Sequence, residues 1–224
     1  MSFLLPKSVK DLPYAFIVAC EGMGDARFLC KLLEHAGVEN CGVGCPSDES
    51  AEGSGFSQLP SYLKAISQAS MREGTNFRGV AVVVDADDDP MTRFTTIASA
   101  LEAASFPRPS KPFGIESSRT RSAVYLIPGE GRNGTLEALF LEAIFRRAPV
   151  LEKCVNDFAN CTGLIPAATE NQRAKMKMSA LAAAHCARNP WTSLGLIWSQ
   201  ENNPIPIESE TFQPLADFLK AFTT

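Results

Sequence analysis

Short apolar runs alternate with segments of helical periodicity over the first two thirds of the chain. Continuous apolar runs at residues 14–20, 78–85 and 123–128 are typical of buried strands, and a shorter strand is expected near Val43. Apolar positions at helical spacing predict one helix that ends at Gly37 and three more at residues 59–72, 90–104 and 135–147. The alternation predicts an α/β fold with a mostly parallel sheet of about four strands.

The last third of the chain has no clear strand pattern. Helical periodicity is found at residues 151–160, 170–187 and 212–222, whereas residues 193–198 fit either a helix or a strand. We therefore expect two parts, which are an α/β domain over residues 10–148 and a helical extension over residues 149–224 packed on it.

Two segments have the composition of loops. Residues 46–56 are rich in Ser, Gly and acidic side chains, and residues 105–114 contain three prolines. Neither segment repeats elsewhere in the chain, and no low-complexity tract is present.

The composition describes a folded chain with a modest negative charge. Its 224 residues are 45% hydrophobic and 21% charged, which suits one substantial core and argues against disorder. The formal net charge of −4 means that any phosphate binding must rely on local basic patches and bound cations. No apolar run of about 18 residues is present, so we expect a cytoplasmic protein without a membrane span.

The seven cysteines do not form a recognisable metal or disulfide pattern. No CxxC pair is present, and Cys41 and Cys45 have no second pair to complete a zinc site. Buried thiols are the expected state of these residues.

Acidic residues follow the predicted strands at the point where each strand ends. Glu21 follows the first strand, Asp85 and Asp87 follow the strongest strand, and Glu137 begins the helix after the last strand. Sites in open parallel sheets form at the carboxyl ends of the strands. Crowded carboxylates repel one another unless cations hold them, and oxygen ligands of this kind suit Mg²⁺.

Several of these acids also have a purely structural explanation. Glu21 could stabilise the positive end of a helix, Asp25 could be an exposed first-turn acid, and Glu137 could be an early acid of its helix. Asp88 and Asp89 precede Pro90 and are expected to cap a helix. An acid at the tip of a four-valine strand rarely helps packing, so a functional role is favoured for Asp85 and Asp87.

The order of these motifs resembles the Toprim domain of topoisomerases, bacterial primases, recombination mediators and OLD (overcoming lysogenization defect) nucleases. Glu21-Gly22 and Asp85-Ala86-Asp87 match the Toprim pattern of a Glu after the first strand and an Asp-x-Asp after a later one. The resemblance covers roughly residues 14–145. It is closest to the nuclease half of the OLD family, in which a second acid follows the first Glu by four positions, as Asp25 does.

Two further motifs agree with the OLD branch. Gly134-Thr135-Leu136-Glu137 matches its Gly-x-x-Glu, and Lys175 or Lys177 is the candidate for a later basic residue. No GxxxxGK[ST] motif is present, so the ATPase half of full OLD proteins is missing from this chain.

The resemblance implies a site for two Mg²⁺ or Mn²⁺ ions. One ion would be held by Asp85 and Asp87, with Glu21 as a ligand or general base, and the other by Asp25 and Glu137. A basic residue from the later helix would neutralise charge on the scissile phosphate, and Lys175 is the first choice for it. Lys177, Arg119, Arg121 and Arg132 would bind nucleic acid, the three arginines from loops beside the acidic motifs.

The function expected from these features is a metal-dependent nuclease that nicks or cuts DNA in phage defence or repair. A separate ABC-type ATPase is a partner that the resemblance suggests, and the chain could also form a homodimer. Two alternatives stay open at this point, which are an RNA-processing Toprim nuclease and a non-catalytic, metal-stabilised module that binds nucleic acid or an ATPase.

Overall fold

The core of the protein is a five-stranded, mostly parallel sheet, as seen in a computed structural model that describes residues 12–46, 55–163, 168–186 and 188–224. The strands lie in the order β2-β1-β3-β5-β4. Their bounds are β1 Phe16–Cys20, β2 Cys41–Gly44, β3 Gly79–Asp85, β4 Ile115–Ser117 and β5 Arg121–Ile127. The predicted α/β fold and mostly parallel sheet are therefore confirmed.

The number of strands differs from the prediction because β4 was not expected. This short strand pairs antiparallel with β5 at the edge of the sheet. Two of its three residues are exposed, so the segment lacks the apolar run that identifies a buried strand. Its pairing with β5 depends on the turn that joins the two strands, which hydrophobic periodicity does not reveal.

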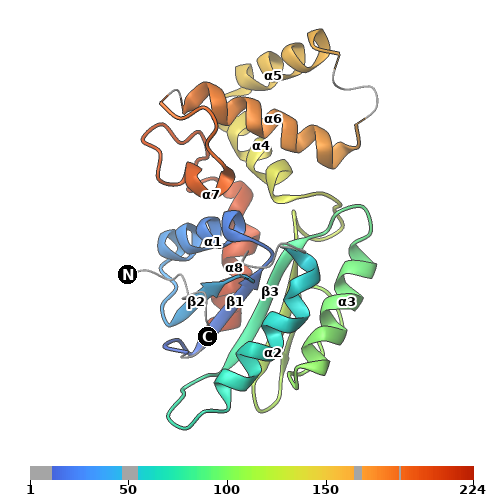
Figure 1. The fold of residues 1–224 in the computed structure, drawn as a ribbon, viewed down its shortest axis with the longest axis vertical. Coiled ribbons are helices and arrows are strands. Elements are labelled where there is room, and N and C mark those ends of the chain that lie inside the picture. Colours follow the sequence, from blue (N-terminus) through green and yellow to red (C-terminus); the bar gives the residue numbers. More distant parts are fainter. Residues whose placement is uncertain (1–11, 47–54, 164–167, 187) are drawn as a thin grey trace.

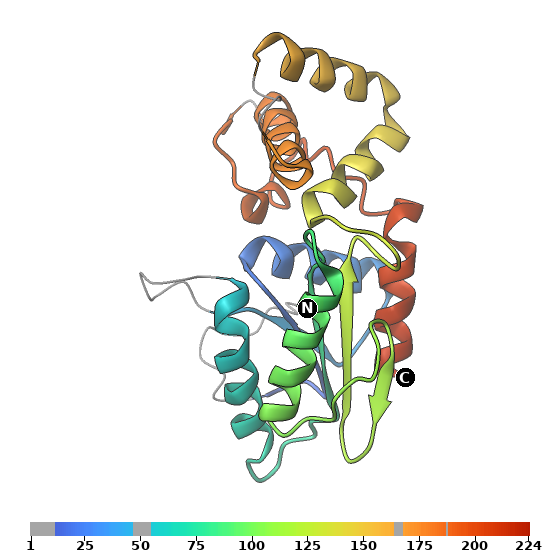
Figure 2. The same ribbon diagram turned by 90° about the vertical axis from the view of Figure 1, so that its right-hand side faces the viewer.

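Helices cover both faces of the sheet. The helices α2 (Leu59–Ser70) and α3 (Pro90–Ala103) pack on one face, and α1 (Met23–Ala36) and α8 (Gln213–Thr223) pack on the other. Figure 1 shows these layers along the sheet, and Figure 2 shows α8 on the opposite side from α2 and α3. β3 lies between β1 and β5, and its first six residues are buried, which explains its run of valines.

A group of helices stands at one end of the sheet. It contains α4 (Leu136–Arg147), α5 (Pro149–Cys161), α6 (Glu170–His185) and the short α7 (Leu194–Ile197). The boundary expected at residue 148 falls between α4 and α5, which pack together along with α6, and α8 returns from this group to the sheet. Phe222 of α8 is fully buried against Phe16 of β1.

Most predicted elements agree with the structure within a few residues, and residues 105–114 contain no helix or strand, as expected. The ambiguous segment near residue 195 forms α7. The loop expected at residues 46–56 falls mostly outside the described residues. The prediction that the cysteines are buried is wrong for Cys154 and Cys161, which are exposed on α5. Among the described helices, none combines the length and apolar character that crossing a membrane requires.

Candidate functional site

The ends of β1 and β3 bring Glu21 and Asp85 together. Cys20 is in register with Val83, so the residues after both strands emerge at the same edge of the sheet. The backbone N–H of Asp85 donates a hydrogen bond to Oε1 of Glu21 at 3.2 Å. Glu21 therefore turns toward Asp85 and does not cap α1, whose N-cap residue is Gly22.

Two helix starts place two more acids at this edge. Asp25 lies in the first turn of α1 and accepts a hydrogen bond from the Gly22 N–H at 2.8 Å through Oδ2. Glu137 lies in the first turn of α4, where the Leu136 N–H donates to Oδ1 of Asp85 at 2.9 Å. Acids are favoured near helix N-termini, so these two hydrogen bonds position the carboxylates of Asp25 and Asp85 and stabilise their ionised forms.

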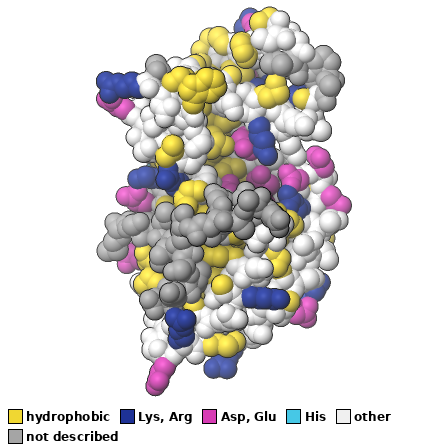
Figure 3. Space-filling model, in the orientation of Figure 1, with side chains coloured by type: hydrophobic (Ala, Val, Ile, Leu, Met, Phe, Trp, Pro, Cys, Tyr) yellow, Lys and Arg dark blue, Asp and Glu magenta, His cyan; other side chains and the backbone are white. Residues whose placement is uncertain are grey.

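The four carboxylates of Glu21, Asp25, Asp85 and Glu137 line one open pocket of about 690 Å³. Two cationic side chains, Arg27 and Lys175, line it as well. Figure 3 shows acidic side chains gathered across the middle of this face, where the helical end meets the sheet. Sequence elements far apart along the chain thus converge on a site where acids outnumber bases.

Burial and mutual repulsion make ionisation unfavourable for three of these acids, Asp85, Asp25 and Glu21. Burial raises the pKa of Asp85 well above its ordinary value, and Asp25, Glu21 and Glu137 raise it further. The pKa of Asp25 rises to about 6, first because of burial and also because of Glu137. Burial raises the pKa of Glu21 too, although the positive charge of Arg93 opposes the increase. A bound cation would relieve this unfavourable charge.

The donor set of the pocket fits a hard divalent cation. All four acids offer carboxylate oxygens, which are the ligands that Mg²⁺ prefers, with water completing the shell. In Glu21, Asp25 and Asp85, one oxygen accepts a backbone hydrogen bond, which leaves the second oxygen for a ligand. Across the described ranges, no three acidic, histidine or cysteine side chains already stand close enough to enclose an ion. Any ion would therefore have to draw the repelling carboxylates together.

Asp87, the second acid of the Asp-x-Asp motif, does not line this pocket. Its backbone adopts a φ of +49° and forms a two-way hydrogen-bonded bridge with Gly134. Its carboxylate forms an ion pair with Arg93 of α3, and the Arg93 guanidinium lies 3.8 Å from the centre of the Phe56 ring. The chain turns sharply after Asp85, so alternate residues of the motif face different neighbours.

Arg93 is a candidate functional residue that the sequence analysis did not identify. It contacts Asp87 directly and lies near enough to Glu21 to lower the pKa of that carboxyl. Arg27, which also lines the pocket, was missed as well. Both stand within helices where a charged residue normally marks a solvated face, so periodicity gives no signal for either.

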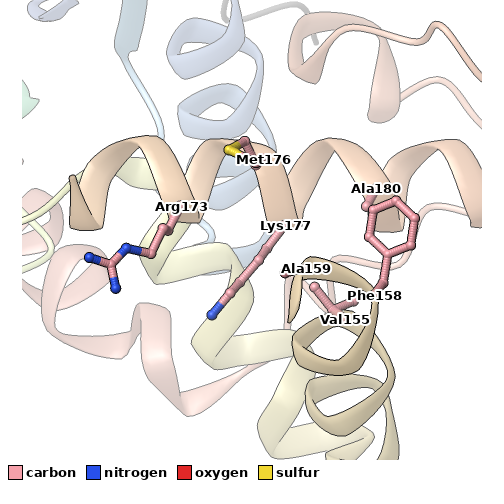
Figure 4. A pocket seen from close by; sticks show the side chains of 7 residues that line it. All are labelled: Val155, Phe158, Ala159, Arg173, Met176, Lys177 and Ala180. Atoms are coloured by element: carbon pink, nitrogen blue, oxygen red, sulfur yellow. The ribbon is translucent and has the colours of Figure 1, made fainter. Parts of the chain in front are cut away.

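The two candidate lysines of α6 lie on different sides of that helix. Lys175 lines the acidic pocket, whereas Lys177 lines a separate groove between α4 and α6. Arg132 lies beside the same groove and forms an ion pair with Glu142. Figure 4 shows Lys177 and Arg173 beside a small apolar hollow between α5 and α6. This hollow has a volume of about 20 Å³, and none of the four acids lines it.

The expected position of Arg119 and Arg121 is wrong. Arg121 begins β5 and Ile127 ends it, and Ile127 is the residue in register with Asp85. Six residues of strand span about 20 Å, so both arginines lie at the opposite end of the sheet from the acids. Arg121 instead donates a hydrogen bond to the Phe222 carbonyl at 3.1 Å and so ties α8 to the sheet.

The predicted caps before α3 are only partly confirmed. Asp89 caps the helix by accepting a hydrogen bond from the Thr92 N–H at 3.0 Å. Asp88 instead accepts a side-chain hydrogen bond from Asn171 of α6 at 3.3 Å, which links the strand-end loop to the helical end of the molecule.

Comparison with known proteins identifies one family. No curated protein and no solved structure matches the chain. The model of a family described as "Protein of unknown function (DUF3226)" matches residues 15–224, which span the sheet, all four acids of the pocket and the C-terminal helices. The chain therefore belongs to the DUF3226 family.

Proposed function

We propose that the protein is a metal-dependent nuclease and that its acidic pocket is the catalytic centre. The observation that carries this proposal is the convergence of Glu21, Asp25, Asp85 and Glu137 on one open pocket at the carboxyl edge of a parallel sheet. Buried acids that ionise unfavourably, as Glu21, Asp25 and Asp85 do, are costly to a fold unless they serve a ligand. A hard cation, Mg²⁺ or Mn²⁺, is the ligand that their chemistry fits.

The motif order supports a Toprim-like assignment of the pocket. An acid follows β1, an Asp-x-Asp follows β3, and Gly134-x-x-Glu137 stands at the start of α4, as in the nuclease half of OLD proteins. In that assignment DNA is the favoured substrate, and a separate ABC-type ATPase is a candidate partner. A cytoplasmic location is part of the same proposal.

The proposed chemistry divides between the bound ion and the chain. When bound, a divalent cation supplies an activated water and stabilises charge on the phosphate. Asp85, Asp25 and Glu137 would hold cations, since their carboxylates line the pocket. Glu21, hydrogen-bonded to the Asp85 backbone, would bind a cation or accept a proton from water. Lys175, which lines the same pocket, would neutralise charge that develops on the scissile phosphate.

A plasmid assay with an isosteric variant tests the proposal. Supercoiled plasmid and single-stranded RNA are incubated with wild-type protein in EDTA, Mg²⁺ or Mn²⁺, and in parallel with Asp85→Asn and Asp217→Asn. We expect the wild-type protein to cleave only when a divalent metal is present. The cleavage rate should fall at least a hundredfold in Asp85→Asn and stay at the wild-type level in Asp217→Asn. Asp217 is a suitable control because it lies on α8, hydrogen-bonded to Gln213 and away from the pocket.

Three results decide among the functional candidates. Cleavage of RNA alone would replace DNA by an RNA substrate. Metal binding without turnover on either polymer would favour a non-catalytic binding module. Equal cleavage by wild type and Asp85→Asn would refute the assignment of the pocket.

A further inference from the structure

Trp191 is the most exposed large apolar side chain that the structure describes. It is 93% exposed, in a segment between α6 and α7 that also contains the exposed Arg188. An indole has a large apolar surface and usually buries most of it against the fold or a partner. Trp198, the other tryptophan of the chain, follows that rule and packs near Phe28 and Phe140.

Short hydrogen bonds hold the turn that carries Trp191. The Asn189 N–H donates to the Cys186 carbonyl at 2.8 Å, which ties the turn to the end of α6. The Thr192 N–H and hydroxyl both donate to the Asn189 carbonyl, at 3.0 and 2.6 Å. Trp191 therefore stands at the tip of an anchored turn, so a ligand that stacks on it would order little additional backbone.

This turn leads directly into the wall of the acidic pocket. Ser193 and Leu194 line the pocket, and two residues of chain span at most about 7 Å, so the Cα of Trp191 lies within that distance of the Cα of Ser193. Nη1 of Arg27 donates to the Gly195 carbonyl at 2.5 Å, and α7 packs on α1, as Figure 1 shows. The position of Trp191 is thereby fixed relative to Asp25 at the start of α1.

The surroundings of Trp191 select a class of ligand. Proteins that bind single-stranded nucleic acid combine an exposed aromatic face, on which a base stacks, with cations that contact the phosphates. Trp191 supplies the aromatic face, and Arg27 and Lys175 supply cations inside the neighbouring pocket. The four carboxylates of the pocket would repel phosphates unless the cations of the proposed nuclease site neutralise them.

We propose that Trp191 is a stacking platform for an unpaired nucleobase close to the scissile phosphate, so that the preferred substrate is single-stranded or locally unpaired. This inference rests on the proposed nuclease function and narrows its substrate class. A paired base already stacks on its neighbours and exposes only its edges, so stacking on Trp191 requires a base outside the duplex.

Tryptophan fluorescence can test this proposal directly, because the chain has two tryptophans. Oligothymidylate and a duplex of equal length are titrated into Asp85→Asn protein, in which cleavage is expected to be absent. Trp198→Phe and Trp191→Phe are each added to this background, which leaves a single reporter. We expect oligothymidylate to quench the Trp191 reporter and not the Trp198 reporter, and the duplex to bind more weakly.

Binding of the same oligonucleotide to two further variants gives the energetic test. Trp191→Ala should weaken oligothymidylate binding by about tenfold to a hundredfold, since one stacked base contributes an affinity change of that size. Phe158→Ala, which removes another exposed aromatic ring on α5, should leave the affinity unchanged. This comparison does not use the Trp198→Phe variant, so it stays valid even if that variant fails to fold.

The proposal is overturned if Trp191→Ala retains wild-type affinity for oligothymidylate, or if only duplex binds. It is also overturned if vesicles of phosphatidylserine and phosphatidylcholine shift the Trp191 emission while oligothymidylate does not. In each of these cases, Mn²⁺ binding and plasmid cleavage by the wild-type protein would leave the nuclease assignment intact. Loss of those two activities would instead contradict the nuclease assignment itself.

Discussion

At the scale of single residues, the contact between Asp87 and Arg93 decides which acids can share a ligand. Asp85 lines the pocket, whereas Asp87 is paired with Arg93. For Asp87 to bind the same cation as Asp85, its ion pair must first separate. In the proposed metal site, Arg93 would therefore compete with a metal ion for the carboxylate of Asp87, and this competition would lower the affinity of the site for the ion.

Replacing Arg93 should reveal this competition. Arg93→Gln leaves the Asp87 carboxylate unpaired, so we expect Mn²⁺ affinity to rise about twofold to fivefold, the range that a partly exposed ion pair allows. Isothermal titration calorimetry would measure it. The double variant Arg93→Gln with Asp87→Asn should return to the affinity of Asp87→Asn alone. A lower affinity in Arg93→Gln would mean that Arg93 organises the site and does not compete for it.

At the scale of elements, the site depends on where strands end and helices begin. Parallel β1 and β3 end at one edge and there deliver Glu21 and Asp85. The first turns of α1 and α4 supply Asp25 and Glu137, together with backbone N–H groups that stabilise the acids. α6 crosses above this edge and adds Lys175, so a helix outside the sheet completes the pocket.

The two lysines of α6 should have separable roles. They are two positions apart, and successive residues turn by about 100° around a helix, so Lys175 and Lys177 face different grooves. Lys175→Ala should lower the kcat of plasmid cleavage about a hundredfold while Mn²⁺ still binds, because it removes a charge beside the reacting phosphate. Lys177→Ala serves as the matched control and should change kcat less than threefold. Equal losses in both variants would exclude a special role for Lys175.

At the scale of the whole molecule, the acidic pocket sets how stability depends on pH. The folded state raises the pKa of Asp25 from 3.8 to about 6, so between these values the folded protein binds more protons than the unfolded chain. The stability that Asp25 contributes is therefore fully present below about pH 4 and is lost as the pH rises through 6. A divalent cation would replace this lost stability at neutral pH.

Thermal unfolding of metal-free protein should show this dependence. Because one pKa unit corresponds to about 1.4 kcal/mol, the Asp25 contribution is on the order of 1–3 kcal/mol between pH 7.5 and 5. We expect Tm to fall from pH 5 to pH 7.5 and Asp25→Asn to flatten this change. Mg²⁺ should raise Tm at pH 7.5 more than at pH 5, where protons compete for the ligands. A Tm that rises toward pH 7.5 without metal, equally in both proteins, would contradict the pKa assignment.

Much of this architecture could be predicted from residue patterns. The apolar runs before Glu21 and Asp85 identify β1 and β3, because a strand buried on both faces needs continuous apolar side chains. Once both strands are parallel neighbours, their carboxyl ends must share one edge. The β4 strand and the roles of Arg93 and Trp191 could not be predicted, because edge pairing, ion pairs and exposure depend on distant segments.

The sequence by itself determined the order of the four parallel strands and the longer helices along the chain, the mostly parallel sheet and the acids at the strand ends, since local periodicity and strand polarity encode all three. Only the tertiary structure decided that Asp87 turns to Arg93, that Lys175 rather than Lys177 lines the acidic pocket, and that Arg121 lies at the opposite end of the sheet. These outcomes depend on distances between segments that are remote along the chain. A pattern along the chain indicates what each residue can do, whereas the packing of the helices and the sheet determines which residues can act together.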